Sequence, residues 1–259
     1  MKALNAVRRI GRRLLRRASP LSPQGKRAGE LAFWRSEIDT YVRWLTGERL
    51  DLYGITPPAA HEIIPADTLA LSAILTWIRK DAGKYLRHLG VPAGIFRGKR
   101  LLEVGCGPLP YALCFTECSI IALDPLLSLY LEAGYPMHSY SHRLHYICAA
   151  GEDIPLAPAS VDAVLSVNAI DHVDDLRQVA REINRALTPD GLILIEAHYH
   201  DPRPLEPLAI DDAVMADLFR TRRLRKVAER TFTQLYPMYP DRRDERLAVW
   251  TNRPETLCE

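Results

Sequence analysis

Hydrophobic runs of strand length alternate with helical patterns from Lys99 onward. This alternation is typical of βαβ units and predicts an α/β fold with a largely parallel sheet. Five strands are predicted, at Arg100–Val104, Ser119–Leu123, His145–Cys148, Val161–Val167 and Leu192–Ala197. The clearest helix is expected at Asp174–Leu187, and Arg246–Thr251 predicts a closing strand that pairs with a run within Lys226–Tyr236.

The chain before Lys99 shows the periodicity of helices and no pattern of strands. Apolar residues recur at intervals of three and four and so share one helix face, at Leu31, Trp34, Ile38, Tyr41, Val42 and Leu45. Pro57 and Pro58 interrupt the pattern, and a second helix is expected from about Thr68 to Leu89. Its predicted buried side consists of Ala70, Ile74, Trp77 and Ile78. Residues 30–98 therefore predict an N-terminal helical extension.

Charge sets residues 1–29 apart as a basic arm. The first acidic residue is Glu30, and every charged residue before it is Lys or Arg. The remainder of the chain is therefore net acidic, which argues against nucleic acid as a partner of the core domain. Within residues 1–17 the apolar side chains lie opposite the arginines. This pattern suits an amphipathic helix on an anionic membrane, an organelle transit peptide or a disordered, solvated tail.

Size, cysteine content and hydropathy bear on organisation and location. A chain of 259 residues, 47% of them hydrophobic, can form one large α/β domain with a smaller attachment. The five cysteines form no CxxC pair, which fits a reducing compartment. No apolar run reaches the roughly 18 residues that span a bilayer, and no secretory signal pattern is present. We therefore expect a cytoplasmic protein, peripheral at the inner membrane surface if the arm binds membrane.

A glycine-containing loop follows the first predicted strand. Gly105, Cys106 and Gly107 stand where open α/β sheets bind ligands, beyond the carboxyl end of a strand, and a helix is expected after them. A dinucleotide fingerprint would place glycine at the sixth position, where this chain has Pro110. The carboxylate of Glu103 suits a ligand that carries an ammonium group rather than phosphates. These features favour an amino-acid-bearing nucleoside over NAD.

Asp124 ends the second predicted strand, 17 positions after Gly107. At that position a carboxylate can accept hydrogen bonds from both hydroxyl groups of a ribose. Any adenosine ligand offers these hydroxyls, so Asp124 supports a nucleoside without identifying it.

The chain from about Lys99 to Thr251 resembles the class I S-adenosylmethionine-dependent methyltransferases of the type 11 kind. Leu101–Pro108 is similar to the first motif of the family, and Asp124 to the second. Gly151–Leu156 is similar to the adenine-binding segment, Val161–Asn168 to the fourth strand, and Ala186–Gly191 to the turn before the fifth. Ala149 and Ala150 stand where many relatives have an acidic residue, so the side chain that contacts the adenine amine is left open.

The resemblance implies a Rossmann-like, doubly wound seven-stranded sheet with a reversed last hairpin, and S-adenosylmethionine as cofactor. The cofactor-binding residues that it implies are Glu103, Gly105, Cys106, Gly107, Asp124, Gly151, Glu152, Asp153 and Asn168. Residues 99–259 would form the methyltransferase domain, and residues 30–98 an extension or lid over the acceptor. The aromatic residues of this extension either line an acceptor pocket or pack it on the sheet: Trp34, Tyr41, Trp44, Tyr53 and Trp77.

Candidate bases follow the fourth and fifth strands. Asp171 and His172 follow one, His198 and His200 the other, and both loops open at the same edge of the sheet. A His–Asp pair there can take the proton of a hydroxyl acceptor. Two alternatives stay open, because His172 can brace the start of a helix, and His198 and His200 can bind a metal from one strand face. Since the sequence offers no evident third ligand, no metal is predicted.

We expect methylation of an oxygen on a small molecule or on a sugar or glycan. The run from His198 to Glu206 and Pro207 is loosely similar to relatives that methylate sugars and glycans. After the fourth strand the chain lacks the Asn/Asp-Pro-Pro-aromatic motif of relatives that methylate nitrogen. A non-catalytic cofactor-binding scaffold that regulates a partner enzyme is the first alternative, and a NAD-dependent oxidoreductase the second. The sequence sets no oligomeric state.

Overall fold

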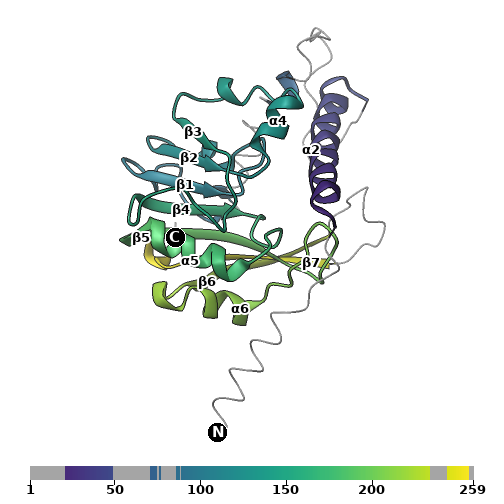
Figure 1. The fold of residues 1–259 in the computed structure, drawn as a ribbon. Helices are drawn as coiled ribbons and strands as arrows, with labels where there is room; N and C mark the ends of the chain where they lie inside the picture. Colours follow the sequence, from purple (N-terminus) through teal and green to yellow (C-terminus); the bar gives the residue numbers. More distant parts are fainter. Residues whose placement is uncertain are drawn as a thin grey trace.

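A computed structural model describes residues 21–48, 71–74, 76, 86–87, 89–233 and 244–256. Its centre is a seven-stranded sheet in the order β3-β2-β1-β4-β5-β7-β6 (Figure 1). The strands are β1 (Arg100–Val104), β2 (Ser119–Leu123), β3 (Leu144–Ile147), β4 (Val161–Val167), β5 (Leu187–Tyr199), β6 (Arg225–Thr233) and β7 (Asp244–Thr251). Strand β7 is antiparallel to both of its neighbours, and the other neighbouring pairs are parallel. The Rossmann-like sheet with a reversed last hairpin is confirmed.

Strand boundaries agree with prediction best in the buried centre of the sheet. Strands β1, β2 and β4 have the predicted bounds, whereas the less buried β3 is shifted by one residue toward the N-terminus. Strand β5 is longer than predicted because Leu187 already pairs with Val161. The register then shifts, and Leu192 pairs with Ala163. The predicted turn at Ala186–Gly191 thus lies largely inside the irregular start of β5.

Both faces of the central strands are covered by apolar side chains. On one face Val164 and Ile193 pack in the cluster that contains α5 (Leu176–Ala186). On the other face Ala163 and Leu194 pack with a cluster that includes Phe96. Burial on two sides explains why these strands appear in the sequence as continuous apolar runs rather than as alternating ones.

Helix α5 is the most clearly predicted helix, and it begins two residues later and ends one residue earlier than the predicted Asp174–Leu187. Asp175 caps it, since its carboxylate accepts hydrogen bonds from the N–H groups of Arg177 and Gln178. Its apolar stripe, at Leu176, Val179, Ala180, Ile183 and Ala186, is buried as predicted. The remaining short helices are α4 (Leu127–Glu132), α6 (Asp212–Leu218) and the 3-10 helices η1 (Tyr111–Cys114), η2 (Met137–Ser139), η3 (Arg220–Arg222) and η4 (Pro254–Thr256).

The prediction of a regular helix after the glycine loop is wrong. The chain forms only the 3-10 helix η1, and Pro110 precedes it as the capping residue. Phe115 then turns the backbone to an extended conformation and is fully buried. A single short turn therefore carries the chain from β1 to β2.

Helix α2 (Pro23–Leu45) stands beside the sheet, across the ends of its strands (Figure 1). It begins inside the segment predicted as an arm, because the Ser22 side chain accepts a hydrogen bond from the Gly25 N–H and proline suits the first turn. The aromatic residues Trp34, Tyr41 and Trp44 are buried in a cluster with Cys106 and Leu109 of the glycine loop, so they pack α2 against this loop.

Several predictions lie outside the described residues. These are the arm through Pro20, the aromatic residues Tyr53 and Trp77, and most of the second helix. Of that helix Ile74 is described and buried as predicted. Among the described ranges, none of the helices has the length and apolar character that crossing a bilayer requires. The division at residues 1–29, 30–98 and 99–259 stays a prediction.

Candidate active site

The glycine loop requires glycine at two positions. Gly105 has a φ of +74° and Gly107 a φ of +56°, a region that side-chain-bearing residues rarely adopt. A Cβ at Gly105 would lie 2.3 Å from the Cβ of Ala169, and one at Gly107 would lie 2.7 Å from the ring of Trp34. The loop is therefore enclosed by the segment after β4 on one side and by α2 on the other.

Glu103 lies beneath this loop and is fully buried. Its two carboxylate oxygens accept hydrogen bonds of 2.9 Å from the N–H groups of Tyr111 and Ala112, at the start of η1. Burial raises the pKa of Glu103 to about 8, although these two amides oppose the shift. The carboxylate shapes the loop from inside, and its contact with a ligand ammonium stays a prediction. The neighbouring Cys106 is a buried thiol whose Sγ contacts the Gly107 carbonyl at 3.3 Å.

Asp124 joins the ends of β1 and β2. One carboxylate oxygen accepts a hydrogen bond from the Gly107 N–H at 2.9 Å, and the other accepts one from the Leu126 N–H at 2.8 Å. Burial raises the pKa of Asp124 to about 6. A carboxylate can accept about four hydrogen bonds, so two of its acceptor positions remain for ribose hydroxyls. The predicted position beside the glycine loop agrees with this geometry.

The predicted adenine segment is tied to the start of α5. Gly151 is buried, and a Cβ there would lie 3.2 Å from Val104. Glu152 Oε1 accepts hydrogen bonds from the N–H groups of Asp174 and Asp175 at 2.8 Å and 3.1 Å. Asp153 is exposed. Glu152 thus braces the segment before the helix, and adenine contacts by Glu152 and Asp153 stay predictions.

Asn168 directly follows β4 and lies in the left-handed region, with a φ of +48°. Its N–H donates a hydrogen bond to the Glu196 carbonyl at 3.1 Å. Its Oδ1 atom is buried and has no hydrogen-bond partner among the described residues. Such an acceptor is positioned to receive a hydrogen bond from a bound molecule.

The four predicted catalytic residues are brought together at the ends of β4 and β5. Asp171 is fully buried, and its Oδ2 accepts a hydrogen bond from His200 Nε2 at 2.9 Å. His172 Nε2 lies 3.9 Å from Asp171 Oδ1, and the ring centroids of His198 and His200 are 6.3 Å apart. The two loops therefore converge, as their shared sheet edge led us to expect.

Glu206 completes this cluster from the loop before α6. Its Oε1 lies 3.9 Å from His172 Nε2, and its Oε2 lies 3.6 Å from His200 Nε2 and 3.2 Å from Arg203 Nη1. Glu206 was singled out in the sequence only by a likeness to relatives that methylate sugars and glycans, and Arg203 was not predicted. Neither belongs to a short motif, and only the path of the loop shows that they face Asp171.

Charge within the cluster is balanced between carboxylates and imidazoles. Burial opposes ionisation of Asp171, yet His172, His200 and His198 hold its pKa below the usual range. Burial likewise opposes protonation of His172, but the carboxylates of Asp171, Glu30 and Glu206 raise its pKa to about 9. The pKa of His200 is raised against its burial by Asp171 and Glu206.

Helix α2 supplies two further members that the sequence analysis missed. Glu30 Oε1 lies 2.7 Å from His172 Nδ1, and Lys26 Nζ donates a hydrogen bond to the His172 carbonyl. Lys26, Glu30 and Trp34 are spaced by four residues, so they share the helix face that Trp34 buries. That spacing is a usable signal, because it places two charged residues on a face predicted to meet the sheet.

Comparisons with known proteins agree with this arrangement. Residues 102–195 match the family model described as a methyltransferase domain. A malonyl-[acyl-carrier protein] O-methyltransferase of Methylovorus sp. (strain MP688) is 34% identical over 104 residues, which cover 36% of this chain and 35% of that protein. An O-methyltransferase of Aspergillus nomiae is 23% identical over 155 residues, which cover 52% of this chain and 68% of that protein. The YcgJ protein from Bacillus subtilis has a TM-score of 0.51 at 15% identity, and the match covers 67% of this chain and 97% of that one.

Residues 102–195 therefore contain a methyltransferase domain. The domain match runs from β1 into β5, and so includes the glycine loop, Asp124 and Asp171. S-adenosylmethionine is the cofactor of this domain, and the residues present fit it. A side chain at Gly105 or Gly107 would collide with Ala169 or Trp34, and Asp124 places a buried carboxylate beside the loop. Because the chain matches only 35% of the length of the Methylovorus protein, the acceptor of that enzyme is not carried over.

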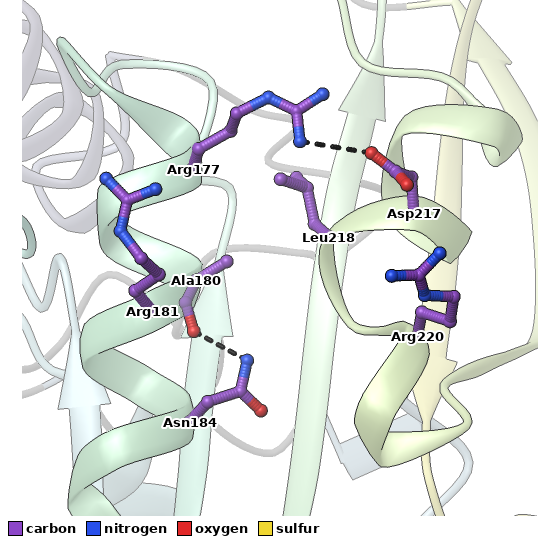
Figure 2. A pocket seen from close by; sticks show the side chains of 7 residues that line it. All are labelled: Arg177, Ala180, Arg181, Asn184, Asp217, Leu218 and Arg220. Carbon is purple, nitrogen blue, oxygen red and sulfur yellow. Dashed lines mark hydrogen bonds and ion pairs between the residues drawn. The ribbon is translucent and has the colours of Figure 1, made fainter. Parts of the chain in front are cut away.

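A pocket between α5 and α6 lies apart from the methyltransferase site. Its lining consists of Arg177, Ala180, Arg181, Asn184, Asp217, Leu218 and Arg220 (Figure 2). Arg177 Nη1 reaches across it to Asp217 Oδ2 at 3.1 Å. None of the predicted site residues lines this pocket, and its ion pair joins the two helices that cover one face of the sheet.

Proposed function

We propose that this methyltransferase transfers the methyl group of S-adenosylmethionine to an oxygen of a small-molecule, sugar or glycan acceptor. One observation carries the proposal. The buried carboxylate of Asp171 has one oxygen bonded to His200 and the other without a hydrogen bond among the described residues. Asp171 lies two residues after Ala169, whose Cβ touches the position a Gly105 side chain would take. The cluster is therefore next to the cofactor loop, and the names of two relatives, both O-methyltransferases, support oxygen as the acceptor atom.

The reaction requires alignment and the removal of one proton. The cofactor supplies its methyl group on a sulfonium, which is a good leaving group. The S–CH₃ bond breaks as the O–CH₃ bond forms, and the acceptor O–H proton must leave. Alignment is provided by the enclosed loop, over which Trp34 of α2 packs against Gly107. Proton removal falls to the charged cluster at the ends of β4 and β5.

Two of the four predicted catalytic residues are already engaged as donors. His200 faces Asp171 Oδ2 through Nε2 and the Asp201 carbonyl through Nδ1, at 2.9 Å and 2.8 Å. Both partners accept hydrogen bonds, so both ring nitrogens carry a proton. His172 likewise turns Nδ1 to Glu30 and Nε2 toward Asp171 and Glu206. We assign these two histidines to positioning and charge balance. The acceptor then meets the cluster face formed by Asp171 Oδ1, His198 and Glu206.

The test is a labelling assay with the full chain and methyl-labelled S-adenosylmethionine. Three acceptor classes are offered: sugars and glycans, small hydroxyl compounds, and a malonyl group on acyl carrier protein. A labelled methyl ether in either of the first two classes supports the proposal. A labelled ester on the malonyl carrier alone would replace it with carboxyl methylation, which needs no proton removal. Binding of S-adenosylhomocysteine without labelling of any acceptor would favour the non-catalytic scaffold.

A further inference from the structure

Three side chains that could bind a metal ion meet in the charged cluster at the ends of β4 and β5. Asp171, His198 and Glu206 are all buried, and one ligand atom from each lies within 4.8 Å of the other two. They come from the segment after β4, from β5 and from the loop before α6. We propose that these three residues bind one divalent transition-metal ion that holds the acceptor oxygen. The ion's role in catalysis rests on the proposed O-methylation, whereas its binding does not.

The carboxylate oxygens support this assignment. Asp171 Oδ1 is buried without a hydrogen bond among the described residues, which costs free energy unless a ligand meets it. Asp171 Oδ2 is fixed by His200 Nε2, and Glu206 Oε2 is fixed by Arg203 Nη1. The two remaining oxygens, Asp171 Oδ1 and Glu206 Oε1, each lie 3.9 Å from His172 Nε2. Each carboxylate therefore has one oxygen near His172 Nε2, while its second oxygen is held by His200 or Arg203. Ligands in protein metal sites are commonly oriented by neighbours in this way.

The ligand types indicate which ions fit. Two carboxylates and one neutral imidazole balance the charge of a divalent ion. An imidazole ligand favours first-row transition ions such as Mn²⁺ or Zn²⁺ over Mg²⁺ and Ca²⁺, which prefer oxygen. Three protein ligands leave a coordination position for the acceptor. The His172 side chain, beside these three ligands, is 23% exposed.

Such an ion gives the acceptor oxygen a direct route to reaction. A hydroxyl bound to a divalent ion loses its proton more readily, and that proton passes to solvent water. The oxygen then forms its bond to the methyl carbon as the S–CH₃ bond breaks, leaving S-adenosylhomocysteine. No electron transfer is involved, so no oxidant or reductant is required.

The experiment measures metal binding by the full chain after treatment with EDTA. Mn²⁺ and Zn²⁺ are titrated by calorimetry, and bound Mn²⁺ is observed by electron paramagnetic resonance. We expect one site per chain, with Mn²⁺ binding weakened by roughly 100-fold or more in His198→Gln and in Glu206→Gln, since even outer-shell changes cost about 10–100-fold. His200→Ala should weaken it by about tenfold, because Asp171 loses its orienting neighbour. The matched control His145→Gln, at an exposed position of β3, should bind as the wild type does.

Each outcome decides the proposal. A wild-type chain without one-to-one binding overturns it, as does binding that survives both ligand substitutions. Melting temperature and S-adenosylhomocysteine affinity show whether each variant is folded, and if Glu206→Gln is not, His198→Gln decides alone. Methyl transfer at full rate in EDTA would remove the metal and leave the proposed function intact. Metal binding at these residues without methylation of any acceptor would support the metal site and contradict the proposed function.

Discussion

The cofactor half and the acceptor half of this site are built in different ways. The cofactor half consists of Gly105, Gly107 and Asp124, which lie close together in sequence and act through backbone conformation and one carboxylate. The acceptor half gathers charged side chains from α2, β4, β5 and the loop before α6. The cofactor half depends on local backbone geometry that only glycine satisfies. The acceptor half depends on tertiary contacts between charged side chains.

This difference predicts how each half responds to substitution. A glycine enclosed on both sides has no alternative conformation that admits a side chain. A network of several ion pairs keeps partial compensation when one member is removed. We therefore expect the largest losses in the cofactor half and graded losses in the acceptor half.

The largest effect is expected from Gly105→Ala. A φ of +74° disfavours alanine by about 1–2 kcal/mol, and the overlap with Ala169 at 2.3 Å adds about 1–3 kcal/mol. The free energy of unfolding, measured in urea, should fall by the sum. Gly98→Ala is the matched control, because its φ is +70° and nothing lies within 4 Å of the added Cβ. Equal losses in the two variants would show that the approach to Ala169 does not matter.

Asp124→Ala should have the next largest effect, on cofactor affinity. Removing the carboxylate takes away the expected ribose contacts and the hydrogen bonds to the Gly107 and Leu126 amides. Affinity for S-adenosylhomocysteine should fall by about 1–3 kcal/mol in titration calorimetry. Asp124→Asn retains one acceptor oxygen and should lose less. An alanine variant that binds as tightly as the wild type would contradict the ribose assignment.

The sequence predicted the strands around the glycine loop well for a physical reason. Strand bounds at β1, β2 and β4, the two glycines and Asp124 all follow from local patterns of apolar residues and turns. The segment after the glycine loop shows the limit, because the predicted regular helix is the short η1. Its first two amides donate hydrogen bonds to the Glu103 carboxylate.

The acceptor half was predicted only where shared topology brings segments together. The ends of β4 and β5 lie side by side in any parallel sheet of this order, so the meeting of Asp171 with His200 could be expected. Arg203 could not, because its position depends on how a long loop packs, and Glu30 could be found only through its spacing on the buried face of α2. The sequence paired His198 with His200 as possible metal ligands, whereas the group that could hold an ion consists of Asp171, His198 and Glu206, because His200 Nε2 faces Asp171.

Glu30→Gln tests how far charge holds α2 to the acceptor half. Glu30 and His172 are largely buried and 2.7 Å apart, so we expect a loss of about 1–2 kcal/mol in unfolding free energy. The control Glu48→Gln breaks the pair with Arg43, whose side chains are 65% and 64% exposed, and should change stability little. If both variants are as stable as the wild type, α2 is held by Trp34 and its apolar neighbours alone.

The smallest effect is a pH dependence confined to the cofactor half. Burial raises the pKa of Asp124 to about 6, so acidification to pH 5.5 leaves roughly a quarter of it ionised. If ribose requires the carboxylate, affinity for S-adenosylhomocysteine should fall about fourfold between pH 7.5 and pH 5.5. Protonation of Asp124 would not unfold the protein, so unfolding cannot explain this fall in affinity. A carboxyl whose pKa is higher in the folded state than its usual 3.8 stabilises the fold when it gains a proton. Asp124→Asn should bind weakly but without this pH dependence, and a flat wild-type profile would mean that the ribose hydroxyls do not need an ionised acceptor.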